Sequence, residues 1–192
     1  MISISLATFG ACALLPDSAD ADAPGRPPKL EDSKVQFVAL NPAKPMPAIP
    51  LRRLDDKPVS LAPTHGRAML VNFWATWSDA CETELPALDA LQQTLGKEID
   101  IAAIAHDGGG RMVVEPFLNK KNIKHLSIYL DPDGVATGIA SSKHQAGPFV
   151  LYGTPMSYFI SPNGEIAGYI PGPVKWGSES AHALLRYFMQ AA

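Results

Sequence analysis

The sequence contains few cysteines: Cys12 and Cys81 are the only two among 192 residues. With one of them inside an apolar N-terminal run, they do not form the disulfide framework of a small secreted domain. The five histidines have no paired ligand spacing, and no Gly-Lys-Ser/Thr follows Gly108–Gly110, so neither a metal site nor a phosphate-binding loop is expected. We therefore predict no metal and no cofactor.

Runs of basic residues are absent as well. The net charge is −3 and lysine or arginine neighbours occur only as pairs, so the sequence gives no sign of nucleic-acid binding. A hydrophobic fraction of 46% is enough for the core of one globular domain. We expect a monomer.

The apolar N-terminal run, residues 2–15, is too short to span a bilayer, which takes about 20 residues. It fits the hydrophobic region of a secretory signal, and Ala19-Asp20-Ala21 provides a small-residue cleavage pattern. No Lys or Arg precedes Arg26, so the start lies upstream or the signal is atypical. Phe9 to Cys12 offers a lipoprotein box instead, and a cytosolic protein with an apolar N-terminus is the alternative. We predict a periplasmic protein, with a tether to the inner membrane through this N-terminus.

Ten of the eighteen prolines fall in the first 63 residues. They prevent helix formation in residues 24–28 and 41–50 and disfavour central strands there. We therefore divide the chain into a signal-like apolar segment (1–21), a Pro-rich tether and extended arm (22–50) and a globular domain (51–192).

Within residues 51–192, short apolar runs alternate with segments of helical periodicity. Leu85, Leu88, Leu91 and Leu95 recur at spacings of three and four, which predicts a helix that buries one stripe. Two β-rich runs around Asn163-Gly164 predict a hairpin. The predicted strands are 59–61, 68–73, 99–105, 126–130, 156–160 and 165–170, and the predicted helices are 82–95, 112–122, 135–140 and 178–191. This order is that of an α/β thioredoxin fold: a central mixed sheet with a parallel β-α-β half, a C-terminal hairpin and helix, and helices on both faces.

One motif stands out, Val71 to Pro86, which reads VNFWATWSDACETELP. Together with Gly153-Thr154-Pro155 and with Gly172-Pro173 before Trp176, it resembles the TlpA/ResA/CcmG group of bacterial membrane-associated thioredoxin-like proteins, and most of all TlpA proteins. That group has Trp-Cys-x-x-Cys where this chain has Trp77-Ser78-Asp79-Ala80-Cys81. The second cysteine is present, and serine replaces the first.

The resemblance implies a thiol–disulfide oxidoreductase that reduces disulfides of exported proteins, in cytochrome or respiratory-complex assembly, with a membrane electron donor. In that family the first cysteine attacks the partner's disulfide at a helix N-terminus, and the second, shielded cysteine resolves the mixed disulfide. Ser78 takes the attacking position and Cys81 the resolving one. Thr154-Pro155 becomes the family's cis-proline beside the active-site turn. The implied substrate-binding residues are Trp77, Asp79, Ala80, Thr154 and Pro155, and Glu84 is a candidate acid or base near Cys81.

Four explanations of Ser78 remain open. It is an engineered replacement of the attacking cysteine, or the mark of a redox-inactive binding or assembly protein. Alternatively, Cys81 works alone through a mixed disulfide, or Ser78 and Cys81 belong to a single-cysteine peroxidase site of the pattern P-x-x-x-[ST]-x-x-C. In that pattern Trp74 stands where proline belongs, and no arginine occurs between Met112 and Leu185.

Overall fold

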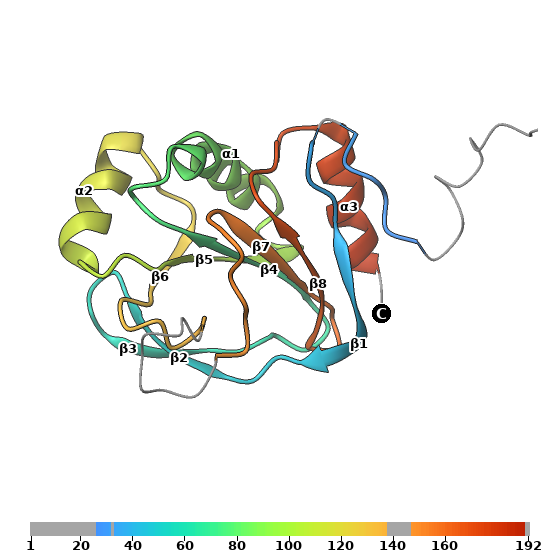
Figure 1. The fold of residues 1–192 in the computed structure, drawn as a ribbon, viewed down its shortest axis with the longest axis horizontal. Coiled ribbons are helices and arrows are strands. Elements are labelled where there is room, and N and C mark those ends of the chain that lie inside the picture. The colour runs from blue at the N-terminus through green and yellow to red at the C-terminus, as the bar shows by residue number, and fades with distance from the viewer. Residues whose placement is uncertain (1–25, 32, 138–146, 191–192) are drawn as a thin grey trace, which may run out of the picture.

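The computed structural model describes residues 26–31, 33–137 and 147–190, which form one mixed eight-stranded sheet and three helices (Figure 1). The sheet order is β1-β8-β7-β4-β5-β6-β2-β3. The strands are β1 (Val38–Pro45), β2 (Ile49–Arg53), β3 (Pro58–Leu61), β4 (Ala68–Trp74), β5 (Ile99–Ala105), β6 (Ser127–Leu130), β7 (Met156–Ile160) and β8 (Glu165–Pro171), and the helices are α1 (Asp79–Leu95), α2 (Arg111–Lys121) and α3 (Glu179–Gln190).

The centre of the sheet is the pair β4 and β5, which run parallel with Ala68 opposite Ile99 and Trp74 opposite Ala105. All seven residues of β4 are buried, because both faces of this strand are covered. β7 pairs with β4 antiparallel, and β8 completes the predicted hairpin. The thioredoxin fold predicted from the order of elements is confirmed, and parallel β4 and β5 end at the same edge of the sheet.

The sequence predicts helices on both faces, and the three helices of the described part of the chain lie on one face of the sheet. One cluster of buried residues contains the inward side chains of all three helices, represented by Leu88, Leu118 and Leu184. The reason is topological. β4, β5 and β6 lie side by side in this order, so two right-handed crossovers place α1 and α2 over the same face. Figure 1 shows the three helices on one side of the sheet.

The opposite face of the sheet is covered by strands and loops. Its buried cluster combines Phe73 and Ile104 from the centre with Ile49, Leu61 and Ile166 from strands nearer the two edges. Only residues 46–48 separate β1 from β2, although these strands stand at and near opposite ends of the sheet order. The sheet must therefore curl until its ends approach each other, which encloses this second cluster.

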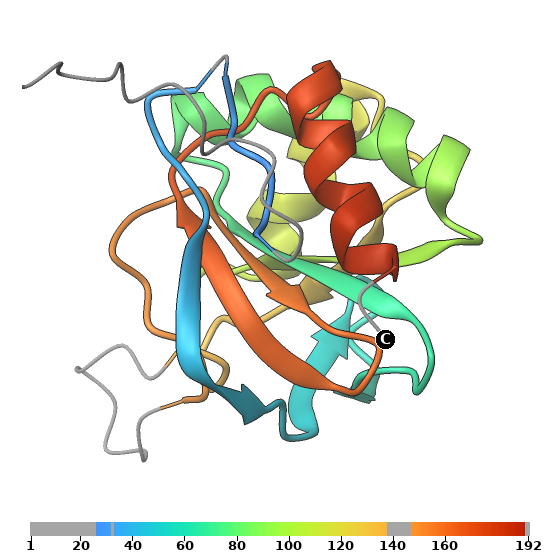
Figure 2. The ribbon, with the colours of Figure 1, turned by 90° about the vertical axis from the view of Figure 1, so that its right-hand side faces the viewer.

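The expected boundary at residue 51 falls inside β2, and the arm expected at 35–50 supplies β1 and part of β2 to the sheet. Among the described residues β1 pairs only with β8, so it is an edge strand of the sheet (Figure 2). Prolines such as Pro42 and Pro45 are tolerated in an edge strand. Pro50 lies in β2, an internal strand. Since β2 pairs with β6 through Arg52 and Arg53, the N–H that Pro50 lacks removes no hydrogen bond between β2 and β6.

The segment expected to be a tether also contacts the core. Leu30 is only 2% exposed and belongs to the cluster beneath the helices. Its backbone N–H donates to the Gln36 side chain at 2.9 Å, and its carbonyl accepts from the Gln36 amide at 2.8 Å. Hydrophobic periodicity could not show that one leucine fixes this Pro-rich segment to the core.

Other segments follow the predictions closely. α1 begins at Asp79 rather than Glu82, because Ser78 caps it. The short helix expected at 135–140 lies partly outside the described residues. No helix in the described part of the chain is long and apolar enough to cross a membrane.

Candidate functional site

The turn between β4 and α1 is held by Ser78. Its backbone is extended, with φ −98° and ψ 113°, and its Oγ accepts the backbone N–H of Cys81 at 3.4 Å. Serine is among the preferred residues at this position, because its oxygen satisfies one of the unpaired N–H groups of the first turn. Asp79 and Glu82 add favourable negative charge there. Ser78 is therefore the N-cap of α1.

The same hydroxyl donates a hydrogen bond of 3.2 Å to the carbonyl oxygen of Thr154. The Thr154–Pro155 peptide bond is cis, as the resemblance implied. Ser78, Cys81 and Thr154, predicted from two distant parts of the sequence, thus meet at one point. Pro155 follows directly at the start of β7.

Cys81 lies one turn into α1 and none of its surface is exposed. Burial raises the pKa of its thiol above the ordinary value, and the hydrogen bond with Ser78 opposes this only in part. The thiol is therefore protonated at neutral pH and shielded from large reagents. This matches the shielded position of the family motif, and it does not favour a peroxidase, which needs an accessible thiolate.

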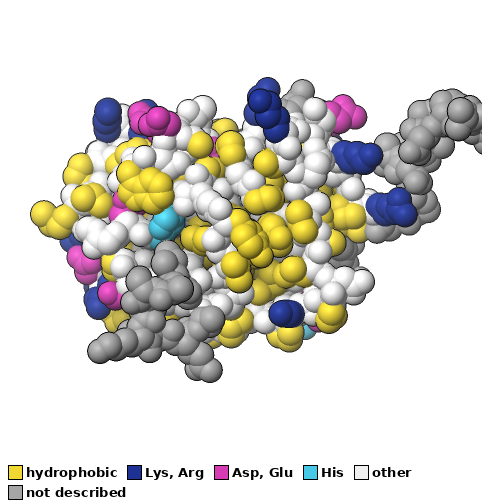
Figure 3. All heavy atoms as spheres, in the orientation of Figure 1, with side chains coloured by type: hydrophobic (Ala, Val, Ile, Leu, Met, Phe, Trp, Pro, Cys, Tyr) yellow, Lys and Arg dark blue, Asp and Glu magenta, His cyan; other side chains and the backbone are white. Residues whose placement is uncertain are grey.

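Trp77 precedes the turn and is 67% exposed. Its ring meets the ring of His106 edge to face, with centroids 5.6 Å apart and planes at 82°. Met112 and Tyr152, from the segments on either side, are 82% and 67% exposed. Figure 3 shows hydrophobic side chains spread across the face seen in Figure 1. Asp79 is exposed and Ala80 is partly buried, so predicted substrate-binding residues of this turn are within reach of a partner.

His106 is the functional candidate that sequence reasoning missed, because it belongs to no motif and shares no paired ligand spacing with another histidine. It follows β5, and its Nε2 lies 2.9 Å from the Thr154 hydroxyl. Burial lowers the pKa of its imidazole, although Asp107 and Asp131 favour the cation. The predicted strand order could have identified His106. Parallel β4 and β5 end at the same edge of the sheet, so the first residue after β5 lies near the turn that begins after β4 and contains Ser78.

Asp107 stabilises the other side of the turn. Its carboxylate accepts the backbone N–H of Thr76 and, at 2.6 Å, the Thr76 hydroxyl. These bonds fix the chain between β4 and Trp77. The residues after β5 thus hold both the turn and the segment before Pro155.

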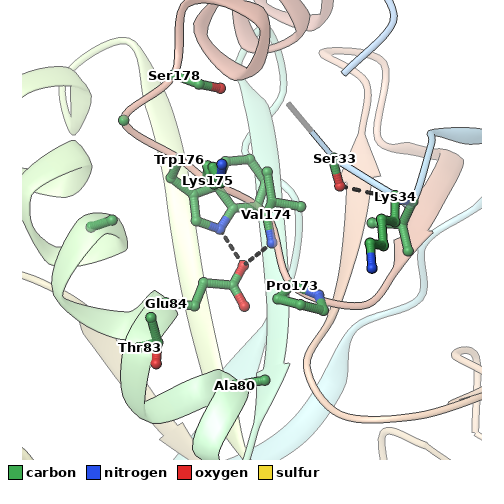
Figure 4. Close-up of a pocket in the computed structure, with 13 residues that line it drawn as sticks. Ser33, Lys34, Ala80, Thr83, Glu84, Pro173, Val174, Lys175, Trp176 and Ser178 are labelled. Atoms are coloured by element: carbon green, nitrogen blue, oxygen red, sulfur yellow. Dashed lines mark hydrogen bonds between the residues drawn. The ribbon is translucent and has the colours of Figure 1, made fainter. Parts of the chain in front are cut away.

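Glu84 lies on the side of α1 that faces the C-terminal segment and is 4% exposed. Its Oε1 accepts the backbone N–H of Val174 and the indole N–H of Trp176, while Oε2 has no partner among the described residues (Figure 4). Burial raises the pKa of Glu84 to about 8. Its carboxyl group is therefore largely protonated at neutral pH.

Glu84 lines a groove of about 1010 Å³ between α1 and the chain that leads to α3. Ala80 and Thr83 contribute from α1, and Ser33 to Val35 close it from the N-terminal segment. The groove is mostly apolar, with Lys34 and Lys175 among its lining residues. Glu84 lines this groove and also acts electrostatically on the Cys81 thiol, one helical turn away on α1.

No group of three or more metal-ligating side chains occurs within the described ranges. The acidic residues near the site, Asp107 and Asp131, are instead occupied by backbone groups, of Thr76 and of Val135 and Ala136 respectively.

Comparison with known proteins decides the family. The model of the AhpC/TSA family matches residues 42–169, two thirds of the chain. The chain belongs to the AhpC/TSA family. The resemblance inferred from the motif is confirmed by named relatives: a thiol-disulfide oxidoreductase ResA of Oceanobacillus iheyensis is 31% identical over 120 residues. That match covers 62% of this chain and 57% of the relative, so the chain spans less than two thirds of that protein's length.

A second relative is the thiol:disulfide interchange protein DsbE of Pseudomonas fluorescens biotype C, 28% identical over 142 residues, or 72% of each chain. Among solved structures, a putative thiol:disulfide interchange protein DsbE from Chlorobium tepidum superposes with a TM-score of 0.62 at 19% identity, covering 77% of this chain and 96% of that one. At this identity the likeness shows the fold alone.

Proposed function

We propose that this chain is a thiol–disulfide oxidoreductase of the ResA/DsbE type in which Ser78 occupies the position of the attacking cysteine. One observation supports this most directly: Ser78 caps α1, with Cys81 one turn inside the helix and the cis Thr154–Pro155 bond beside it. A thiolate at position 78 would receive the N–H of Cys81 and the field of the helix N-terminus.

The reaction of such a site has two steps. A thiolate at position 78 attacks one sulfur of a partner disulfide, forming a mixed disulfide and releasing the other partner sulfur as a thiolate, which takes up a proton. The Cys81 thiol then loses its proton and attacks the mixed disulfide, which releases the second partner thiol and leaves an internal disulfide. A serine hydroxyl without an adjacent base does not perform the first step at neutral pH. The chain as written therefore lacks the dithiol cycle.

In the second step we assign proton transfer to Glu84. Cys81 must lose its proton although burial disfavours its thiolate, so a nearby group that exchanges protons near neutral pH would help. With a pKa of about 8, a fraction of Glu84 is ionised near neutral pH, and this carboxylate form accepts the proton that Cys81 loses. A Glu84→Gln substitution in the Ser78→Cys background should slow release of the mixed disulfide, and an unchanged release rate would remove Glu84 from this role.

The proposal includes protein partners that are exported and a periplasmic location for this chain. The apolar run at residues 2–15 and the prolines that follow support export and a spacer before the sheet. Fusion of residues 1–50 to alkaline phosphatase, which is active only after export, tests the location. Inactive fusions would contradict it.

The alternative is a redox-inactive binding or assembly protein, and one observation favours it. Ser78, Thr154 and His106 are joined by hydrogen bonds without any thiol, while Trp77 remains exposed. The arrangement of Ser78, Thr154 and His106 beside Trp77 therefore needs no sulfur to keep its shape.

The test that separates the two is insulin reduction by the Ser78→Cys variant, with dithiothreitol as the electron source. The proposed function expects turnover well above the uncatalysed rate for this variant. Neither the unsubstituted chain nor Ser78→Cys combined with Cys81→Ala should show it. No turnover from a folded Ser78→Cys protein would leave the binding protein as the better account.

A further inference from the structure

A backbone hydrogen bond holds His106 in place independently of its side chain. Its N–H donates to the Trp74 carbonyl at 3.1 Å, which extends the parallel pairing of β4 and β5 by one residue. The imidazole therefore stands at the edge of the sheet where α1 begins. It is partly buried, unlike the exposed His65 and His125.

From this position the ring joins two segments that the sequence separates widely. Its Nε2 lies 2.9 Å from the Thr154 hydroxyl, and its ring packs against Trp77. Thr154 is thus held at two points, by Ser78 at the carbonyl oxygen and by His106 at the side chain. Residues 150–155 contain no helix or strand, so these bonds help to hold Thr154 in place, together with the start of β7 at Met156.

The charged groups that act on His106 come from the segments after β5 and β6. Asp107 follows it directly after β5, and Asp131 follows β6, with Asp133 close to Asp131. Asp107 also acts on the Cys81 thiol of α1, which is protonated at neutral pH. Asp107 is held by Thr76 and Asp131 by the backbone at Val135 and Ala136, so neither carboxylate moves freely to neutralise an imidazolium.

We propose that His106 is a positioning residue for partner binding: it fixes Thr154 beside Trp77, and only its neutral form leaves this site ready for an extended, uncharged stretch of partner chain. The inference rests on the proposed function, because it concerns the same partner-binding site around Trp77 and Thr154, and it adds a pH dependence to partner binding there.

The physical reason is desolvation. A neutral imidazole provides one donor and one acceptor, whereas the protonated ring provides two donors and a charge. A partner that covers Trp77 and Thr154 removes water from His106 and so disfavours the cation further. By linkage, partner affinity must then fall as the pH drops through the titration of His106.

The first test uses the chain as it stands. Trp77 fluorescence, isolated by comparison with Trp77→Phe, and the Thr154 methyl resonance should change with one shared midpoint below the ordinary histidine value of about 6.5. His106→Gln, which keeps a hydrogen-bonding group but does not titrate, should abolish both changes. The exposed control His65→Gln should preserve them. Signals that do not vary with pH, or that persist in His106→Gln, would overturn the proposal.

The second test measures binding of a rhodamine-labelled, reduced and carbamidomethylated insulin B chain, in which the cysteines are blocked by a neutral group. Loss of one positioning hydrogen bond corresponds to about threefold to tenfold in affinity. We expect that loss in His106→Ala at neutral pH, rescue by His106→Gln, and a similar loss in the unsubstituted chain as the pH falls below the midpoint found in the first test. Equal affinity in all chains, or no binding at any pH, would overturn the proposal. Turnover by Ser78→Cys is measured separately, so failure of the proposed function remains distinguishable.

Discussion

The Ser78 hydroxyl donates to the carbonyl oxygen of Thr154, the residue before the cis Pro155 bond. This 3.2 Å bond joins the N-terminus of α1 to the start of β7 and occupies the acceptor that faces the turn. Serine thus performs two structural tasks at the position where the family's chemistry needs a sulfur. Its capping bond to Cys81 explains how the site keeps its form without the attacking thiol.

The reactivity of Cys81 follows from its burial. In a Cys12→Ser background, we expect Cys81 to react with iodoacetamide at pH 7 at least about tenfold more slowly than a free thiol with a pKa of about 8.5. The raised pKa and the missing exposure act in the same direction. The rate against pH, compared with that of the urea-unfolded chain, checks this. Equal rates for folded and unfolded chains would contradict it.

Glu84 makes stability depend on pH. Its folded pKa of about 8 lies above the value of 4.5 for an unperturbed glutamate, so the folded chain keeps a proton that the unfolded chain releases. The contribution of Glu84 to the free energy of unfolding is therefore greatest below pH 4.5 and is lost as the pH rises towards 8. Glu84→Gln should stabilise the protein by about 1–3 kcal/mol near pH 8 and by less at low pH.

Urea unfolding at several pH values measures this difference. Glu82→Gln is the matched control, because Glu82 lies on the same helix but is only partly buried and is paired with Lys121, which lowers its pKa. It should give no gain at high pH. A Glu84→Gln gain that does not change with pH would show that ionisation is not its cause.

Leu30 should behave as a core residue although it lies in the Pro-rich N-terminal segment. Removing its buried side chain in Leu30→Ala should lower the free energy of unfolding by about 2–4 kcal/mol. The exposed neighbour in Glu31→Ala should change it by less than about 0.5 kcal/mol. If both substitutions prove neutral, the folded domain does not include this segment.

Sequence patterns predicted the centre of the molecule well and its margins less well. β4, β5 and α1 have strong local signals, a short apolar run in each strand and a regular leucine spacing in the helix. The face on which α2 packs depends on the order of strands in the sheet, which no local pattern contains.

The site shows the same division. Ser78, Cys81 and Pro155 were found because a motif names them, and the structure brings them together. His106 belongs to no motif, and its importance appears only when β5 is paired with β4. Glu84 was considered for its nearness to Cys81 in sequence, but its burial against Trp176 depends on a contact 92 residues away.

Trp77 should matter for partners and not for folding. Because its ring is 67% exposed, Trp77→Ala should leave the unfolding transition nearly unchanged. In the Ser78→Cys background it should raise the KM for insulin about tenfold, with a smaller change in kcat, since exposed aromatic residues often dominate binding. Val38→Ala, an exposed apolar residue on β1, is the control and should change neither constant.

The central claim is that position 78 is the attacking position of a disulfide site that otherwise remains intact. Peptide mapping of Ser78→Cys after mild oxidation tests it most directly. Our account predicts an internal disulfide between the new thiol at position 78 and Cys81, seen as a linked peptide lighter by two hydrogens. Two free thiols in a folded, oxidised variant would contradict the account, because the turn would then not hold the two positions in bonding geometry.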